Sequence, residues 1–512
     1  MIKILRRLQG GLVERFDPQK ETAMPDLSIN EAGLANAVQR AKEKNIIIPT
    51  FEQMRKPETI PAPIKKRLAL LGLWDLDPAN LFRISWKNEP RAFGGGYGSV
   101  NHLELPSSLT GVKARIVLML GKWFPTGAHK VGAAFGCLVP RLVTGRFDPT
   151  REKAVWPSTG NYCRGGAYDS NLLGCDSIAI LPEGMSRERF DWLAKIAGET
   201  IKTPGTESNV KEIFDKCREL RDSGDKLQIF NQFDDMGNYL WHYAVTGQAM
   251  AELIKSLITN DSQFKGVVLC TGSGGTIASG DYLKTLYPLS KIAASEAAQC
   301  PTLLNNGFGE HRIEGIGDKH VPWVHNTKNT DLVIAVDDEV PMQLIRLFNE
   351  PEGKEFLVSR GVAPNVVDSL ELLGISSVAN TIAAIKFAKY YELTEEDLVL
   401  TMATDSMEMY GSRLREMEEA RGKMDVVASA VAWSALRQTA TDLMEELSYQ
   451  GRKRIHNLKY YTWVEQQGKT YQEIQAQWYD PSYWTSVQAA GPDVDRRINE
   501  FNQRTGLLAN LS

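Results

Sequence analysis

Short apolar runs alternate with longer amphipathic segments between residues 115 and 402. The apolar runs have the length and composition of strands. They are Arg115–Leu120, Lys153–Trp156, Ser177–Leu181, Gln228–Phe230, Gly266–Cys270, Ile292–Ser295, Leu332–Val336 and Leu398–Met402. The segments between them predict helices at Lys130–Thr144, Cys163–Leu173, Arg187–Ala197, Val210–Arg221, Tyr239–Leu257, Thr276–Leu286, Pro341–Asn349 and Ala379–Tyr391. This alternation predicts an α/β fold with a mostly parallel sheet covered on both faces.

The two ends of the chain have a different pattern. Residues 1–110 are irregular and rich in Pro and Gly, apart from one helical stretch at Ile29–Lys44. We interpret this region as an arm that wraps the body or a partner subunit. Residues 407–512 are mostly helical, with a highly charged stretch at Arg413–Arg421 and an amphipathic one at Ala428–Leu447. They indicate a helical cap or an oligomer contact.

Composition narrows the function classes. Hydrophobic residues make up 43% of the 512 positions and the net charge is -4, which argues against broad nucleic-acid binding. No apolar stretch approaches the roughly 18 residues of a membrane span, and the first residues lack the pattern of a signal peptide. Six scattered cysteines without a C-x-x-C pair suggest a reducing cytoplasm.

Lys130 follows Pro125–His129 and opens a predicted helix. A lysine in a first helical turn is ordinarily a solvated surface residue, and it lies unfavourably at the positive end of the helix dipole. Its presence there suggests that the amine works in a neutral or Schiff-base form.

A second motif, Pro157–Tyr162, lies between a predicted strand and a predicted helix. Its small residues can present backbone N–H groups that hold a carboxylate. Ser, Thr and Asn also cap helices well, so an ordinary capped turn is the alternative.

A third motif, Thr271–Thr276, follows the predicted strand Gly266–Cys270 and contains three glycines. Glycines let the backbone approach a phosphate closely, and the next helix supplies N–H donors. The segment has neither the Walker sequence nor the dinucleotide-binding spacing. A phosphate cradle and an ordinary tight turn both remain open for this segment alone.

The three motifs occur in this order, each at a strand-to-helix turn. In this setting the chain resembles the fold type II pyridoxal-phosphate enzymes, particularly cysteine synthase and cystathionine β-synthase. Thr126–Lys130 is also similar to the lysine segment of the tryptophan synthase β chain. Other similar segments are Glu183–Arg189, Asn231–Phe233, His242–Tyr243, Thr246–Gly247, Arg312–Gly317 and Thr404–Ser406.

The resemblance spans roughly residues 115–410 and implies two mostly parallel α/β lobes with the active site between them. Residues 1–114 would form the N-terminal arm and part of the large lobe. Residues 115–406 would form the catalytic core, with a small lobe at about 150–245 inserted in the large one. Residues 407–512 would form a helical C-terminal extension.

The resemblance also implies pyridoxal 5′-phosphate as the cofactor, held by Lys130 as a Schiff base. Lys130 would move the substrate α-proton, His129 would lie near the phosphate, and Asn161 would hydrogen-bond the cofactor's 3′ oxygen. The phosphate would be bound by Gly272, Ser273, Gly274, Gly275 and Thr276. The substrate carboxylate would be bound by Ser158, Thr159, Gly160 and Tyr162, with Gln232 assisting.

Ser406 would face the pyridine nitrogen. A neutral hydroxyl does not hold that nitrogen protonated, which suits β-elimination and discourages transamination. If the side chain of the adjacent Asp405 reached the nitrogen instead, the argument would reverse.

The implied reaction is β-replacement on an activated serine, with sulfide or a thiol as the nucleophile. A β-eliminating ammonia-lyase or desulfhydrase acting on a small amino acid is the alternative. A non-catalytic subunit of the same fold is the third hypothesis, and the complete set of three motifs argues against it. Val131 and Tyr162 depart from the cysteine synthase pattern and leave the substrate open. Because such enzymes are commonly dimers, we expect a homodimer.

No metal site is expected. His311, His320 and His325 lie close in sequence, but their spacing matches no helical metal pair. We expect these histidines in loops or at the surface.

Overall fold

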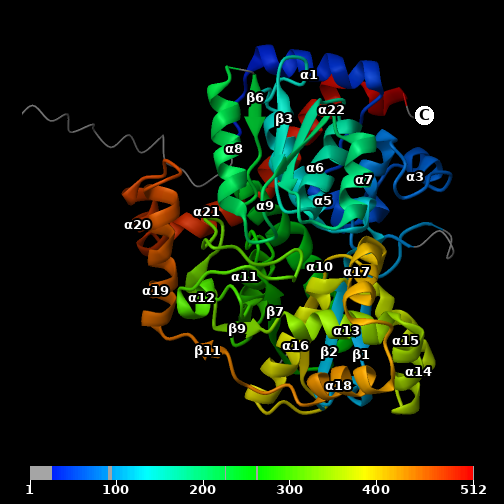
Figure 1. The fold of residues 1–512 in the computed structure, drawn as a ribbon. Helices are drawn as coiled ribbons and strands as arrows, with labels where there is room; N and C mark the ends of the chain where they lie inside the picture. The colour runs from blue at the N-terminus through cyan, green and yellow to red at the C-terminus, as the bar shows by residue number, and fades with distance from the viewer. Residues whose placement is uncertain (1–25, 90–94, 225, 261–262, 511–512) are drawn as a thin grey trace, which may run out of the picture.

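The computed structural model describes residues 26–89, 95–224, 226–260 and 263–510. It contains two lobes, each built on its own sheet (Figure 1). The larger sheet consists of β1 (His102–Leu105), β2 (Arg115–Leu120), β7 (Phe264–Cys270), β8 (Lys291–Ala297), β9 (Leu332–Val336), β10 (Leu398–Ala403) and β11 (Met444–Glu446). The smaller sheet consists of β3 (Lys153–Pro157), β4 (Ser177–Pro182), β5 (Glu199–Thr203) and β6 (Leu227–Ile229).

Both sheets are mostly parallel, which confirms the predicted α/β fold. The strand order is β1-β2-β10-β7-β8-β9-β11 in the larger sheet and β5-β4-β3-β6 in the smaller one. Only the edge strands β1 and β11 run antiparallel to their neighbours in the described sheets. The central strands are buried on both faces, as expected for near-continuous apolar runs covered by helices.

Helices cover both sheets (Figure 1). Those around the smaller sheet are α5 (Lys130–Leu142), α6 (Asn161–Leu172), α7 (Arg187–Ile196), α8 (Val210–Asp222) and α9 (Met236–Trp241). Those around the larger sheet include α10 (Gly247–Leu257), α11 (Ile277–Leu286), α12 (Thr302–Asn305), α13 (Glu339–Asn349), α14 (Pro351–Ser359), α15 (Pro364–Ser369) and α16 (Ile375–Tyr390). Helix α16 is buried along nearly its whole length because it is apolar on every side.

The amino-terminal region packs into the main core. It contains α1 (Glu31–Lys44), α2 (Phe51–Arg55), α3 (Ala62–Leu68) and α4 (Ser107–Thr110). Leu34 and Val38 of α1 and Phe51 of α2 are buried in the largest apolar cluster of the molecule.

Among the described residues, the carboxyl-terminal region contains six α-helices and one strand after residue 410. The helices among the described residues are α17 (Gly411–Arg421), α18 (Val426–Arg437), α19 (Tyr449–Lys459), α20 (Tyr471–Tyr479), α21 (Ser482–Ala489) and, closing the chain, α22 (Gly491–Thr505). The amphipathic stretch 428–447 is helical only to Arg437, and β11 then extends the edge of the larger sheet.

Helix α22 returns to the amino-terminal region and lies beside α1 (Figure 1). The buried side chain of Asn502 accepts a hydrogen bond from the Ile48 N–H (3.1 Å) and donates one to the Ile48 carbonyl (2.8 Å). The Asp495 carboxylate accepts hydrogen bonds from the backbone N–H groups of Phe51 and Glu52. The two ends of the described chain are therefore held together by paired backbone groups.

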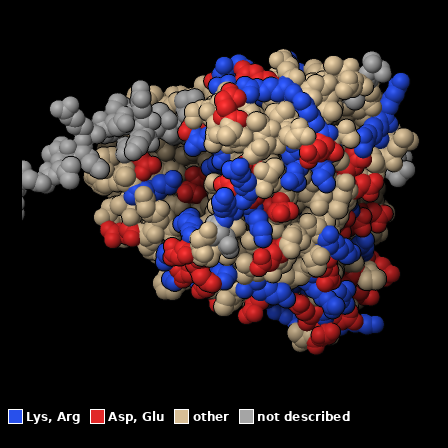
Figure 2. Space-filling model, turned by 90° about the horizontal axis from the view of Figure 1, so that it is seen from above, with Lys and Arg blue, Asp and Glu red and all other residues tan. Residues whose placement is uncertain are grey.

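The distribution of surface charge and the hydropathy of the helices bear on which partners the protein can bind. Positive and negative side chains are interspersed over the face shown in Figure 2. Among the described residues, no single helix has the length and hydropathy needed to cross a membrane, although the sharply bent pair Pro364–Leu372 and Ile375–Tyr390 meets both criteria when taken together.

We expect Asn502→Ala to lower the free energy of unfolding by about 2–4 kcal/mol, because it leaves a buried N–H and a buried carbonyl of Ile48 unpaired. Urea denaturation measures the change. Asn499→Ala, at an exposed position of the same helix, is the control and should be nearly neutral. Equal effects of the two substitutions would contradict this account of how the chain ends are joined.

Candidate active site

A strained turn leads into Lys130. Thr126 and Gly127 both have positive φ angles, of 68° and 70°, and only glycine adopts such angles without cost. The Thr126 carbonyl accepts a hydrogen bond from the buried guanidinium of Arg164, with Nη2 at 2.9 Å. Helix α5 then begins at Lys130. The position of the lysine is therefore set by a turn that the surrounding residues hold in place.

The Lys130 amine contacts the glycine turn of the other lobe. Its Nζ donates a hydrogen bond to Ser273 Oγ at 3.1 Å, and Asn238 Nδ2 donates to the same oxygen at 3.1 Å. Burial lowers the pKa of Lys130 to about 8, although nearby groups, Glu207 among them, act in the opposite direction. A larger share of the amine is therefore neutral near pH 7 than in an ordinary lysine.

The glycine turn presents free backbone donors. Within the described structure, none of the N–H groups of residues 272–276 donates a hydrogen bond. Gly274 has a φ angle of 72°, and a Cβ on Gly275 would overlap the amide of Asn238. Helix α11 begins immediately afterwards, at Ile277. Free donors at a helix start form an anion-binding site.

Lys130 and the glycine turn line one cavity at the carboxyl ends of β7 and β10. Its wall also includes residues that the sequence did not single out as site residues, such as Asn380, Met402 and Thr404. His129 lines the same cavity and is fully buried, and neither ring nitrogen has a hydrogen-bond partner. Trp86 stacks on its ring at 5.5 Å, and burial holds the pKa of His129 well below its ordinary value. A neutral imidazole with free nitrogens can donate to a ligand in this cavity.

The asparagine turn is held by partners from other parts of the chain. Ser158 Oγ accepts hydrogen bonds from Gln232 Nε2 (3.3 Å) and from the Gly160 N–H (3.0 Å). Thr159 Oγ1 donates to the buried carboxyl of Glu207, whose pKa burial raises to about 7. Helix α6 begins at Asn161, two residues earlier than predicted. The structure thus brings Ser158, Thr159, Gly160 and Gln232 together in one turn.

Asn161 and Asp405 are joined across the two lobes. Asn161 Nδ2 donates to Asp405 Oδ2 at 2.7 Å, and the Tyr410 hydroxyl donates to the same oxygen at 2.7 Å. Burial raises the pKa of Asp405, and Arg189, with Nη2 at 3.7 Å, opposes that shift. The neighbouring Ser406 Oγ is buried without a partner.

Tyr162 lies in the core of the smaller lobe. Its ring packs edge-on against Trp156, with centroids 5.4 Å apart, and its hydroxyl is buried without a hydrogen-bond partner. The side chain is therefore in a different environment from the four turn residues before it.

Sequence reasoning missed a group of buried charges around these turns. Arg189 forms an ion pair with Glu314 and donates to the Tyr410 hydroxyl at 2.9 Å. The guanidinium of Arg164 lies near the rings of both Trp74 and Trp192, 5.5 Å and 4.7 Å from their centroids. Arg189 and Glu314 fall in segments that resemble the family, but the pairing of two residues 125 positions apart has no signal in a single sequence. Arg164 could have been noticed in the sequence, because it is a charged residue in a run of mostly small residues that follows Asn161.

The residues present fit pyridoxal phosphate. An amine with a lowered pKa lies beside a turn of unpaired N–H groups, which suits an aldehyde and a phosphate on one molecule. His129 and Ser406 contribute further buried polar atoms without partners.

The family model described as "Pyridoxal-phosphate dependent enzyme" matches residues 96–358, just over half of the chain. The chain belongs to this family of pyridoxal-phosphate-dependent enzymes. The matched segment includes Lys130, the asparagine turn and the glycine turn. It extends further toward the amino terminus than the resemblance recognised in the sequence, and it ends before Asp405 and Ser406.

The chain is also similar to individual curated proteins over more than half of its length. Cystathionine β-synthase of Saccharomyces cerevisiae is 27% identical over 316 residues, which are 60% of this chain and 59% of the yeast protein. The chain thus spans less than two thirds of that relative. A probable cysteine synthase of Bacillus subtilis is 28% identical over 298 residues, 58% of this chain and 88% of that protein.

Solved structures share the fold. O-acetylserine sulfhydrylase isoform 3 of Entamoeba histolytica matches with a TM-score of 0.54 and 21% identity, over 66% of this chain and 93% of that structure. This likeness confirms the predicted fold type II architecture.

The three clustered histidines lie in loops, as expected, and His311 and His325 are buried there rather than at the surface. His325 is fully buried and its Nε2 lies 2.8 Å from Thr330 Oγ1. His311 is also buried, and His320 Nδ1 lies 2.7 Å from Asp318 Oδ1. All three serve in local packing or hydrogen bonding.

We expect Gly275→Ala to weaken the binding of pyridoxal phosphate by about 10-fold or more, because the new Cβ would displace Asn238 and the N–H groups beside it. Titration of the cofactor-free protein, followed by absorbance, measures the affinity. Gly491→Ala is the control, since the nearest atom to its Cβ would be at an ordinary 3.6 Å. If the two variants bind the cofactor equally well, the turn is not its phosphate site.

We expect the reaction of Lys130 with an amine-selective reagent to rise about 10-fold between pH 7 and pH 9 and then level off, because the amine loses its proton near pH 8. A lysine with the ordinary pKa of about 10.4 would keep rising beyond pH 9. Peptide mass spectrometry of the cofactor-free protein follows the modification. Continued increase at pH 10 would show that the amine is not desolvated.

Proposed function

We propose that this chain is a pyridoxal-phosphate-dependent enzyme that replaces the β-substituent of an activated serine with sulfide or a thiol. The observation that carries the proposal is the contact between Lys130 Nζ and Ser273 Oγ, which joins the reactive amine to the glycine turn at 3.1 Å. The relatives named cysteine synthase and cystathionine β-synthase, which belong to the same family, support this reaction class.

Pyridoxal phosphate, when bound, supplies an aldehyde for the substrate amine and a conjugated ring that withdraws electrons from the α-carbon. The chain supplies the binding groups. The free N–H groups of residues 272–276 hold the phosphate, and His129 adds a neutral donor. Ser158, Thr159 and Gly160 hold the substrate carboxylate, with Gln232 fixing Ser158. Tyr162 would contribute only its backbone N–H, because its side chain is buried in the smaller lobe.

Lys130 then acts as the base. Its pKa of about 8 leaves part of the amine neutral near pH 7, so Nζ can accept the α-proton of the substrate. The two turns fix the acid group and the phosphate on either side of this amine, which limits the motion of the substrate α-carbon.

Ser406 rather than Asp405 faces the pyridine nitrogen in this proposal. Asp405 already accepts hydrogen bonds from Asn161 and Tyr410, whereas the Ser406 hydroxyl is buried without a partner. A hydroxyl at that place favours loss of a β-substituent over transamination. Asn161 would exchange its bond to Asp405 for one to the cofactor's 3′ oxygen.

We also propose that the enzyme works in the cytoplasm as a homodimer. All six cysteines are free thiols, which suits a reducing compartment. The homodimer rests on the resemblance to the fold type II enzymes. We further propose that the chain divides into an N-terminal arm with part of the large lobe (1–114), a catalytic core (115–406) and a helical C-terminal extension (407–512).

The test is an assay of the loaded enzyme with O-acetylserine and sulfide, with cysteine as the measured product. We expect wild type and Lys113→Ala, an exposed lysine, to form cysteine, and Lys130→Ala to lose at least about 10³-fold in rate. Formation of pyruvate and ammonia alone would favour the β-eliminating alternative. A protein that cannot be loaded with the cofactor would overturn the proposal and indicate a non-catalytic subunit.

A further inference from the structure

A second cavity, of about 250 Å³, lies against the turn that leads to Lys130. Much of its wall is apolar and is formed by Leu71, Leu73, Trp74 and Trp123. Pockets for drug-sized ligands are typically about 300–1,000 Å³. The volume and the wall therefore suit a small molecule with an apolar part.

The cavity contains a buried positive charge, Arg83, and the carboxylate of Glu89 in the same wall acts on it from beyond ion-pair distance. Arg83 is only 4% exposed, and its guanidinium donates to the carbonyls of Leu68 (3.1 Å) and Gly96 (3.0 Å). Among the described residues, no Asp or Glu forms an ion pair with it. Burial lowers the pKa of Arg83, which reflects the cost of holding this charge in the interior. An anion in the cavity would offset that cost.

Lys122 and Glu408 add one charge of each sign to the same wall. Their nearest atoms are 3.7 Å apart, which is longer than a hydrogen bond. The two groups form a loose ion pair, so a ligand that carries both charges can separate them, its carboxylate binding the Lys122 ammonium and its ammonium the Glu408 carboxylate.

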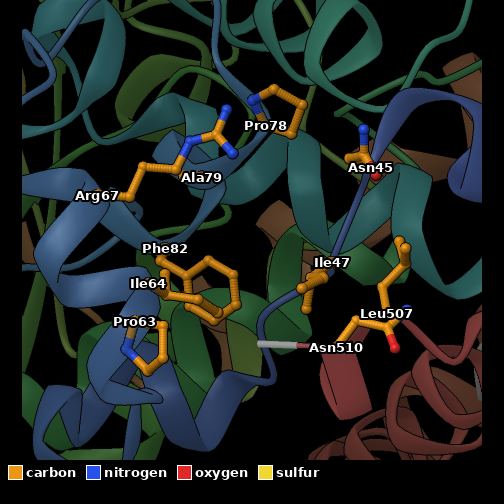
Figure 3. Close-up of a pocket in the computed structure, with 10 residues that line it drawn as sticks. All are labelled: Asn45, Ile47, Pro63, Ile64, Arg67, Pro78, Ala79, Phe82, Leu507 and Asn510. Atoms are coloured by element: carbon orange, nitrogen blue, oxygen red, sulfur yellow. The ribbon is translucent and has the colours of Figure 1, made fainter. Parts of the chain in front are cut away.

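Another cavity of similar volume lacks this combination of charged side chains. That cavity, of about 240 Å³, is shown in Figure 3 and lies between α3 and the carboxyl-terminal residues. Its one arginine, Arg67, is neutralised by Asp77 at 2.6 Å. Its walls are otherwise apolar or uncharged, so it offers no unpaired charge to a ligand.

We propose that the cavity beside Trp74 binds a free α-amino acid in its zwitterionic form, at a site separate from the catalytic cavity. The carboxylate faces Arg83 and Lys122, the ammonium faces Glu408, and an apolar side chain packs against Trp74. Trp74 and Arg83 lie before the segment matched by the family model and Glu408 lies after it, so this site is built largely from residues outside that segment.

The site is in direct contact with the catalytic turn. A Cβ on Gly127 would lie 2.7 Å from Glu408 Oε1 and 2.8 Å from a ring carbon of Trp74. Gly127 is three residues before Lys130 and shares its left-handed turn with Thr126. A ligand that moves Trp74 or Glu408 therefore changes the space available to this turn, which gives the two sites a coupling free energy.

The experiment uses L-norleucine, which has no leaving group on its β-carbon, with the pyridoxal-phosphate-loaded enzyme. Calorimetry reports all binding, whereas the absorbance of the cofactor reports only binding at the catalytic site. We expect a binding event without an absorbance change. L-norleucine amide and N-acetyl-L-norleucine, which lack one charge each, should bind at least about 10-fold more weakly at this site.

Variants separate this site from the catalytic one. Lys122→Ala and Glu408→Gln should each weaken, by at least about 10-fold, the binding of L-norleucine that leaves the cofactor absorbance unchanged. Lys66→Ala, on the exposed side of α3, should not affect this binding. Binding that always changes the cofactor absorbance, or that is insensitive to both cavity variants, would overturn the proposal. Because binding is measured without turnover, this failure is independent of the proposed reaction.

Discussion

Two hydrogen bonds between the lobes hold the candidate site together. Lys130 Nζ donates to Ser273 Oγ, and Asn161 Nδ2 donates to Asp405 Oδ2. In each pair, one residue belongs to a helix beside the smaller sheet and the other follows a strand of the larger sheet. Strands of parallel sheets end at the same edge, so the turns that follow them can meet when two such sheets face each other. The geometry of the cavity depends on this meeting of strand ends.

The site contains more buried charge than its proposed chemistry requires. Arg164, Arg189, Glu314 and Asp405 are all almost fully buried beside the asparagine turn. Burying charges is costly unless they are paired, and here Glu314 pairs with Arg189 and also with Arg413 of α17. These pairs connect the smaller lobe to the segment after β10. They restrict the relative position of the two lobes around the cavity.

Much of the fold could be predicted from the sequence, because buried parallel strands are continuous apolar runs. The limits of β2 and β9 agree with the predicted ones. Strands β1, β5 and β11 were missed because their sequences, His102–Leu105, Glu199–Thr203 and Met444–Glu446, are short or carry several polar residues. Each lies at the edge of its sheet, where one side is less covered and the apolar pattern weakens.

The three motifs were also recognisable from the sequence, since glycines and polar residues at strand-to-helix turns have a local signature. The roles assigned to their residues remain predictions. What could not be predicted is which distant residues contact them. Glu207 beside Thr159, Arg164 beside Thr126 and Asp405 beside Asn161 are contacts made by the tertiary fold, and no spacing in the chain encodes them.

The packing of α1 against α22 has a consequence for how the chain reaches its native state. Part of the apolar face of α1 is covered by a helix that begins about 450 positions later, at Gly491. During synthesis on the ribosome, that part of the face has no native partner until the segment that forms α22 has emerged. Contacts so distant in sequence slow folding and prolong the exposure of hydrophobic surface. The core around α1 is therefore completed late, and this part of its apolar face stays uncovered until α22 has been synthesised.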